Sequence, residues 1–214
     1  MHWNRTSREP AGLYTGMPVF VLWCGLLVGC AGGSVAVPTG FPVPLVEKVR
    51  LPVGIYLDDA LTGYTHVEAV EGHGEWEIEL GSAQRSMFAN LATGMFIGHR
   101  FVERADARNP DVAGVLIPSI EELQFTLPSQ TRTEYHEVWI RYRFQMLDNQ
   151  GNPLSNWILT AYGKSHQQNY SGASASLQAA ALDACRDAMA DFALRFRSFP
   201  GVSGWLQAET GDVT

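Results

Sequence analysis

The feature that most constrains the fold is a run of alternating residues from Tyr135 to Leu147. Every second residue is apolar and the residues between are mainly polar, which is the period of a half-buried β-strand. The turn residues 148–152 follow, and the extended run 157–164 comes next. The pattern predicts a long antiparallel hairpin. Because 157–164 is apolar on both faces, we expect that strand to be central or covered.

Four other segments are predicted as strands from their period of two, and they are 51–57, 75–80, 96–103 and 115–127. Pro118 places part of the last strand at an edge or a bulge, because proline donates no ladder hydrogen bond. The Gly-rich segment 62–74 is predicted to be a loop.

Two amphipathic helices are predicted. The first runs from Ser82, as N-cap, to about Gly94. The second runs from about Ser174 to Arg197 and carries one apolar stripe at helical spacing. Cys185 lies on this stripe, so we expect a small core residue rather than a reactive thiol. The stripe consists of Leu182, Cys185, Met189, Phe192, Phe196 and Phe199.

Together these elements predict one α+β domain over residues 51–200, in which a mainly antiparallel sheet carries two helices packed on one face. No internal repeat indicates a second domain. Residues 201–214 are predicted to be a flexible tail.

The N-terminal segment has the features of a targeting signal. Arg5 and Arg8 precede the apolar run Met17–Leu27, which is shorter than the roughly 20 residues of a membrane-spanning helix and suits a signal-peptide core. Leu27-Val28-Gly29-Cys30 then has the form of a bacterial lipoprotein processing site. Residues 1–29 are therefore predicted to be removed, and Cys30 to carry lipid chains that insert into a membrane.

Residues 30–50 are rich in Gly and Pro and are predicted to be a flexible tether. The alternative is that Cys30 ends a transmembrane helix and is an ordinary thiol. A second alternative concerns the start of translation, because initiation at Met17 would shorten the long segment ahead of the apolar run. That start would leave no positive charge before it, which favours Met1.

The chain of 214 residues has a formal net charge of −7, and the segment ahead of Cys30 contributes two arginines and one glutamate to it. Nucleic acid is therefore not an expected partner, since phosphate contacts need clustered Lys and Arg. Of the three cysteines, Cys24 is removed, Cys30 is lipidated and Cys185 remains without a partner, so no disulfide is predicted. We expect no cofactor, and the oligomeric state is left open.

Several features between Leu51 and Phe199, taken together with the lipobox, resemble those of a known group of proteins. They are Gly81 ahead of a helix, Asp111 ahead of the Val115 strand, the turn at Asp148-Gln150-Gly151, Gly163, and the alanine-rich segment 179–193. With these features the chain resembles Gram-negative envelope lipoproteins: the YajG-like lipoproteins, the auxiliary lipoproteins of ABC-type lipid transport systems, and periplasmic domains related to PelC and the N-terminal part of TolB.

The resemblance implies a non-enzymatic adaptor or accessory subunit. A lipid anchor would hold the domain at a membrane, on the periplasmic side, while its surface engages an envelope transport or assembly complex. Ala31 and Gly32 follow the cysteine in place of a retention aspartate, which by the enterobacterial rule implies the outer membrane, with the inner membrane as the alternative. The resemblance supplies no active-site residues.

No catalytic signature is found in the sequence. It contains no Gly-x-Ser-x-Gly elbow, no Walker loop and no dinucleotide fingerprint. His66 and His73, with two glutamates between them in the predicted loop, are weak candidate metal ligands. A metal-dependent hydrolase is therefore only a minor hypothesis, and the chain is predicted not to be an enzyme.

The candidate partner-binding residues are Tyr135, Trp139, Arg141 and Arg143, which share the polar face of one strand. Exposed Trp and Arg are enriched at binding hot spots. The alternative is that another element covers this face and Trp139 belongs to the core. A polar segment, 165–176, is predicted to be a mobile lip or a plain connection.

Two hypotheses for the function follow. The first is an envelope adaptor that binds a protein partner through this strand face. The second is a module that binds a small amphiphile such as a lipid, suggested by the two-faced apolar strand 157–162 beneath a Phe-rich helix.

Overall fold

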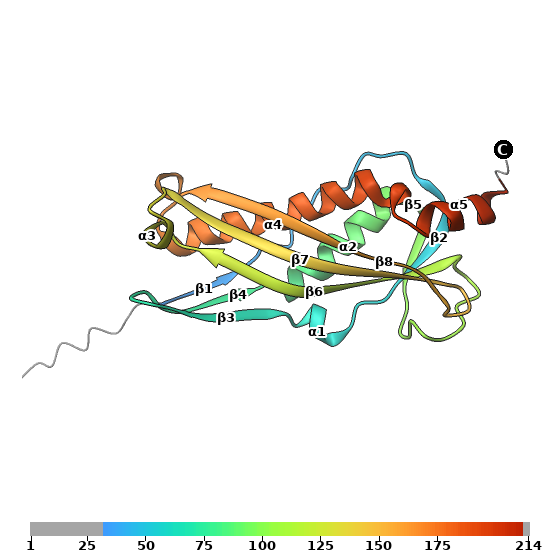
Figure 1. Cartoon of the computed structure of the whole chain (residues 1–214), viewed down its shortest axis with the longest axis horizontal. Helices are drawn as coiled ribbons and strands as arrows, with labels where there is room; N and C mark the ends of the chain where they lie inside the picture. The colour runs from blue at the N-terminus through green and yellow to red at the C-terminus, as the bar shows by residue number, and fades with distance from the viewer. Residues whose placement is uncertain (1–31, 212–214) are drawn as a thin grey trace, which may run out of the picture.

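The computed structural model describes residues 32–211. The strands form two sheets, one of five strands in the order β5-β2-β6-β7-β8 and one of three in the order β1-β4-β3. The predicted α+β class is confirmed, with helices on one face of the larger sheet (Figure 1). Both sheets are mixed: β2 is parallel to β5 and β6, and β1 is parallel to β4.

The predicted hairpin is the longest feature of the larger sheet. Strands β7 (Tyr135–Asp148) and β8 (Pro153–His166) pair antiparallel along their whole length. Strand β6 (Gly114–Thr126) lies on the other side of β7, and β2 (Val49–Ile55) and β5 (Phe96–Phe101) complete the sheet. The predicted inward side chains of β7, from Val138 to Met146, are all buried.

Pro118 lies where the sequence analysis expected, in a stretch of β6 with an open edge. Pairing of β2 with β6 covers only Gly114–Leu116 of β6, so the rest of β6 pairs only with β7 among the described residues. A register shift between Ile120 and Glu122 follows Pro118. Proline is tolerated here because that side of the strand needs no ladder donor.

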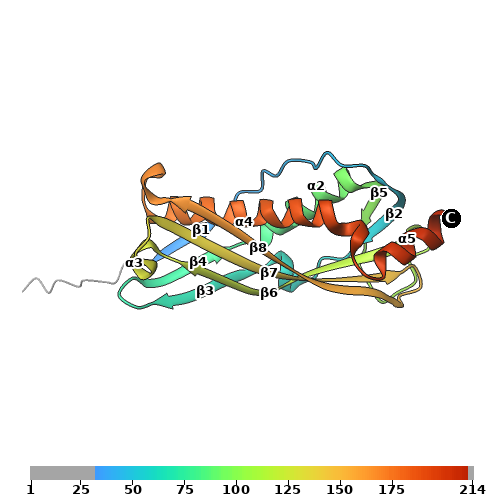
Figure 2. The ribbon, with the colours of Figure 1, turned by 45° about the horizontal axis from the view of Figure 1, so that its top comes forward.

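Two long helices cover the inner face of the larger sheet. Helix α4 (Ala173–Arg195) packs along β8 and β7, and α2 (Gly81–Met95) packs against β5 and beside α4. Figure 2 shows both helices on the same side of the sheet. The remaining helices are short: α1 (Asp59–Thr62), α3 (Pro128–Thr131), α5 (Val202–Thr210), and the 3-10 turns η1 (Gln167–Asn169) and η2 (Phe196–Ser198).

The smaller sheet was not predicted as a unit. It consists of β1 (Gly33–Ala36), β4 (Gly74–Glu79) and β3 (Thr65–Val70). Strand β4 has the predicted alternation, with Trp76 and Ile78 buried and the glutamates outward. The prediction of a loop over 62–74 was wrong, because β3 occupies its middle as an edge strand whose side chains are largely exposed.

The segment predicted to be a flexible tether is attached to the domain at several points from Gly33 onward. Strand β1 pairs with β4, and Val35 and Val37 are each 3% exposed. The connection to β2 then crosses α2 (Figure 2), where Ser86 Oγ and Asn90 Nδ2 donate to the carbonyls of Thr39 and Phe41. The tether prediction is therefore contradicted at β1 and at Phe41, which pack against the core, whereas most side chains of residues 42–48 are exposed.

Two smaller predictions also need correction. Residues 202–210 form α5 rather than a flexible tail, because Val202 and Trp205 are buried. Ser82 is not the N-cap of α2; Leu80 occupies that position without a side-chain cap. For the strand over 157–164, predicted to be central or covered, the second alternative holds: β8 lies at the edge of the sheet and α4 covers its inner face.

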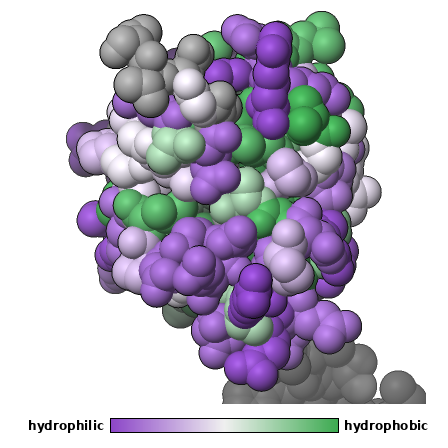
Figure 3. All heavy atoms as spheres, turned by 90° about the vertical axis from the view of Figure 1, so that its right-hand side faces the viewer, coloured by the Kyte–Doolittle hydropathy of each residue, from purple (hydrophilic) through white to green (hydrophobic). Residues whose placement is uncertain are grey.

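The end of the molecule that carries α5 has a mixed surface in which hydrophilic side chains predominate (Figure 3). Within the part of the chain that the structure describes, no helix is both long enough and apolar enough to cross a membrane. The predicted signal peptide and Cys30 lie outside the described residues.

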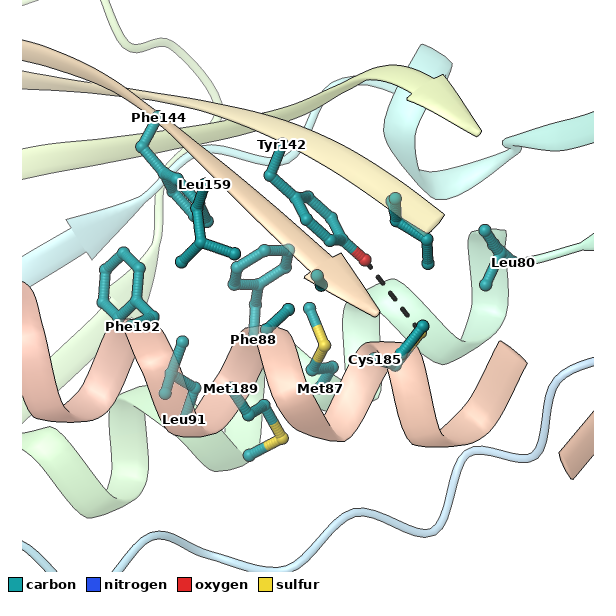
Figure 4. Close-up of a cluster of buried hydrophobic side chains, with 14 of the residues drawn as sticks. Leu80, Met87, Phe88, Leu91, Tyr142, Phe144, Leu159, Cys185, Met189 and Phe192 are labelled. Carbon is teal, nitrogen blue, oxygen red and sulfur yellow. Dashed lines mark hydrogen bonds between the residues drawn. The ribbon is translucent and has the colours of Figure 1, made fainter. Parts of the chain in front are cut away.

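A small polar cluster is buried inside the core, where α2, α4 and β7 meet (Figure 4). The Tyr142 hydroxyl donates to Gln84 Oε1 at 3.1 Å and lies 3.9 Å from Cys185 Sγ, and Gln84 Nε2 donates to the same sulfur at 3.7 Å. Burial raises the pKa of Tyr142 well above its usual range and that of the Cys185 thiol to about 12. Cys185 is therefore a core residue, as predicted.

This burial predicts an inert thiol. With Cys24 and Cys30 replaced by serine, Cys185 should not react with a thiol reagent at pH 8 in the folded protein, and should react stoichiometrically in denaturant. Because its folded pKa exceeds its unfolded value of about 8.5, its contribution to stability is complete below that pH and declines as the pH rises towards 12. Rapid native labelling would contradict the assignment.

Candidate interaction surface

The four predicted binding residues lie together on the side of the larger sheet that faces away from α2 and α4. Tyr135, Trp139, Arg141 and Arg143 alternate with the buried residues of β7 and point to the opposite face. Tyr135 and Arg141 are exposed, and Trp139 and Arg143 are partly exposed. We call this surface, with its neighbours on β6 and β8, the outer face. Within residues 32–211 no element covers it.

Trp139 is held by an aromatic partner from the neighbouring strand. Its ring centroid lies 5.2 Å from that of Tyr162, the residue opposite it on β8. The Tyr162 hydroxyl donates to Glu137 Oε1 at 2.6 Å, and desolvation together with this carboxylate raises the pKa of Tyr162 to about 12. Side chains braced in this way lose little entropy when a partner binds.

The two arginines share a single carboxylate. Arg141 Nε donates to Glu121 Oε2 at 3.0 Å, and Arg143 also pairs with Glu121. Arg143 Nη1 further donates to Asn156 Oδ1 at 3.1 Å. Surface ion pairs of this kind stabilise the fold by at most about 1 kcal/mol. Glu122 lies opposite Arg141 on β6, so the outer face carries charged groups of both signs.

A shallow depression of about 390 Å³ lies beside Trp139 and Arg141. The β6 residues Glu122, Gln124 and Thr126 and the β8 residue Thr160 complete its lining. Trp139 supplies an apolar wall, and the other lining side chains supply hydrogen-bond donors and acceptors. This combination suits a protruding side chain of a protein partner better than it suits a buried small molecule.

Tyr135 marks one end of the outer face and is itself buttressed. Lys164 Nζ lies 5.1 Å from the centroid of its ring, and the His166 ring meets it edge-on at 5.0 Å. The outer face therefore carries aromatic rings flanked by cationic groups along its length, a composition typical of interface hot spots.

The weak metal candidates are not brought together. His66 Nε2 lies 3.1 Å from Glu68 Oε2, and its ring meets Phe125 edge-on. His73 lies in the turn after β3, with Nε2 2.8 Å from Ser129 Oγ. Among residues 32–211, no group of three His, Cys, Asp or Glu side chains has the arrangement of a metal site. The predicted clustering of His66 and His73 in one loop is therefore wrong.

The predicted lip is tied down at both ends. The Ser165 hydroxyl donates to the Ser176 carbonyl at 2.5 Å, and both residues are buried. Turn η1 occupies the middle, where the Gln167 amide donates to the Glu134 carbonyl at 2.9 Å. The segment is thus a structured connection between β8 and α4.

The space between β8 and α4, which suggested a lipid site, is filled with aromatic rings. Trp157 stacks on Phe144 and on Phe199, with centroids 5.5 Å and 4.6 Å apart, and Phe192 lies 4.8 Å from Phe144. This packing gives stability rather than a binding chamber.

Sequence reasoning missed the partners that orient the predicted residues. Tyr162, Glu121 and Glu137 lie on other strands or other positions of the same face, and the register of the sheet brings them to Trp139 and the arginines. A regular hairpin closed at residues 148–152 would pair residue 139 with residue 161, and the register shift between Met146 and Leu147 moves the pairing to Tyr162. No pattern in the sequence announced that shift.

Comparison with known proteins shows the fold of this chain. No protein-family model matches the sequence, and no curated protein matches it. Among solved structures, a Xanthomonas campestris protein of the DUF330 family covers 86% of this chain and 100% of its own, with a TM-score of 0.50 and 10% identity. At this identity, the likeness supports a shared fold.

Two other solved structures are more distant. A Chlamydia trachomatis protein covers 70% of this chain and 97% of its own, with a TM-score of 0.40 and 9% identity. A minor lipoprotein from Acinetobacter baumannii covers 73% of this chain and 97% of its own, with a TM-score of 0.35 and 17% identity.

Proposed function

We propose that this protein is a lipid-anchored envelope lipoprotein, without catalytic activity of its own, that binds a protein partner of an envelope transport or assembly complex through the outer face. The observation that carries the proposal is the pair of neighbouring rings of Trp139 and Tyr162 beside the exposed Arg141, on a sheet face that no described element covers. The anchor rests on the lipobox ending at Cys30, and the periplasmic side of the outer membrane rests on the sequence argument given above.

The charges of the outer face indicate the chemistry of the partner. Arg141 and Arg143 share Glu121, Glu122 lines the depression beside Arg141, and Glu137 lies opposite Lys164. A partner surface with a protruding apolar side chain, flanked by a carboxylate and a cationic group, would complement Trp139, Arg141 and Glu122.

Photo-crosslinking in the native cells tests this proposal. A photoreactive residue in place of Trp139 should give one specific adduct with an envelope protein, and adding Arg141→Glu should reduce that adduct at least tenfold. The matched control places the same residue at Leu194, which is 78% exposed on α4, away from the outer face. No adduct at position 139, or equal adducts at 139 and 194, would refute the proposal.

A further inference from the structure

A cavity of about 360 Å³ opens at the end of the molecule where α4 begins, near α3 (Figure 1). Its walls come from segments far apart in the sequence. Trp76 of β4, the start of α3 and the first residue of α4 line it, together with side chains from β7 and η1. The lining residues used below are His73, Trp76, Ser129, His136, Gln168 and Ala173.

The first turn of α4 presents uncapped donors to this cavity. The N-cap is Gly172, with a φ of 115°, and no side chain accepts a hydrogen bond from the first turn. The helix has 23 residues, so its backbone dipoles add a partial positive charge at this end. Free N–H groups at the start of a long helix favour an anion.

A second and independent observation comes from β7. The His136 side chain lines the same cavity, is 2% exposed, and its Nδ1 has no hydrogen-bond partner among the described residues. Ser165, the residue opposite it on β8, uses its hydroxyl on Ser176 instead. A buried nitrogen without a hydrogen-bond partner destabilises the folded protein, and a bound acceptor would remove that cost.

The charges around the cavity agree with an anionic ligand. None of its lining residues is Asp, Glu, Lys or Arg. The Glu134 carboxylate, at the same end, is 2.9 Å from His166 Nε2. His73 Nε2 contacts the Ser129 hydroxyl, also within the lining. Burial lowers the pKa of His136, so its imidazole is neutral near pH 7 and can donate one hydrogen bond without a fixed charge.

We propose that this cavity binds a phosphate group, held by the backbone N–H groups at the start of α4 and by His136. A tetrahedral oxyanion has enough acceptor atoms to meet the helix and the imidazole together. Trp76, Leu127 and Pro128 give the cavity an apolar wall, on which the organic part of a phosphate ester would lie. The phosphate belongs either to a phospholipid headgroup or to a free phosphate compound.

The position of the cavity makes a headgroup a fitting source. Gly33 has room only for hydrogen beside Trp76 and Ser174, which lie at the cavity and at the start of α4. Only two residues lie between Cys30 and Gly33 in the sequence, so the chain between them can span at most about 10 Å. The headgroup source therefore rests on the proposed lipid anchor at Cys30, whereas the phosphate site itself does not.

The test uses the full mature protein in non-ionic, phosphate-free detergent at pH 7, with intrinsic tryptophan fluorescence and thermal stability as readouts. Inorganic phosphate, phosphatidylglycerol and phosphate-free diacylglycerol are titrated in turn at constant ionic strength. His136→Leu fills the same space without a nitrogen, and Ser174→Asp adds a negative charge to an exposed position in the first turn. The matched controls are Ser174→Asn and His166→Gln.

We expect saturable binding that His136→Leu and Ser174→Asp each weaken at least tenfold and that both controls leave unchanged. Saturable binding of inorganic phosphate would support the site and would show that free phosphate is sufficient as its ligand. A response to phosphatidylglycerol, but not to phosphate or diacylglycerol, supports it with the headgroup as ligand. No saturable response, or equal binding in His136→Leu, would overturn the site, without bearing on the outer face or its partner.

Discussion

Gly163→Ala should destabilise the protein by about 3 kcal/mol or more. Gly163 lies on the inner face of β8, and a Cβ there would overlap the backbone of α4 at the Ala180 carbonyl and the Ala184 amide. Both obstacles are main-chain atoms, so no side-chain rotation can relieve the overlap, and α4 must move away from the sheet. Overpacking of well-packed interiors costs about 1–3 kcal/mol and sometimes more.

Urea unfolding followed by circular dichroism measures this effect, and thermal unfolding should show a fall of roughly 6–12 °C for a domain of this size. Gly204→Ala is the matched control. A Cβ at Gly204 meets nothing within 4 Å, and the residue lies within α5. Alanine there should be neutral or stabilising by about 0.5–1 kcal/mol. If Gly163→Ala unfolds at the same urea concentration as the control, the described contact between α4 and β8 is wrong.

Cys30→Ala should abolish lipid attachment. The proposed thioether forms only on the Cys30 sulfur, and each methylene of an attached chain contributes about 0.8 kcal/mol to membrane binding. In cells fed labelled palmitate, the wild-type protein should carry label and the variant should carry none. Its processing should also stop, so that the precursor keeps residues 1–29 and migrates more slowly in electrophoresis.

Two other cysteine variants control this experiment. Cys24→Ala removes a thiol upstream of the lipobox, and Cys185→Ala removes the buried one. Both should retain label at the wild-type level, and Cys185→Ala tests whether loss of the core thiol affects processing. Label that persists in Cys30→Ala, or disappears in Cys24→Ala, would show that the processing site has been misassigned.

The larger elements were predictable because their side chains repeat with a clear period. The alternation around Tyr142 identified β7 and its buried face, and the turn at residues 148–152 identified the hairpin. The spacing of Met189 and Phe192 identified α4 and its covered side. These patterns are local, and each lies in a segment long enough for the period to show.

The short elements were not predicted, because their sequences are too short or too exposed to show such a period. Strand β1 has only four residues shortly before Pro38, and it is a strand because β4 offers a parallel edge at Trp76–Glu79. Strand β3 is exposed along most of its length, so burial imposes no alternation on its sequence. Helix α5 is anchored by Val202 and Trp205, whose burial depends on elements far away in the chain.

For the candidate surface, too, the sequence was sufficient for one part of the prediction and the structure was needed for the other. The sequence was sufficient to place Tyr135, Trp139, Arg141 and Arg143 on one face of a strand, because strand residues two apart point the same way. Whether another element covers that face is a question of how layers pack, and the structure answers it for the described residues by placing both long helices on the opposite side.

By itself, the sequence determined the lipobox, the α+β class and the orientation of β7, since these depend on local order and on hydrophobic period. Only the tertiary structure decided that Tyr162 braces Trp139, that Glu121 is shared by two arginines, and that His136 lies unpaired at the start of α4. Each of these features joins residues 20 or more positions apart, or depends on packing between layers. Their formation is determined by sheet register and helix docking, which no local pattern encodes.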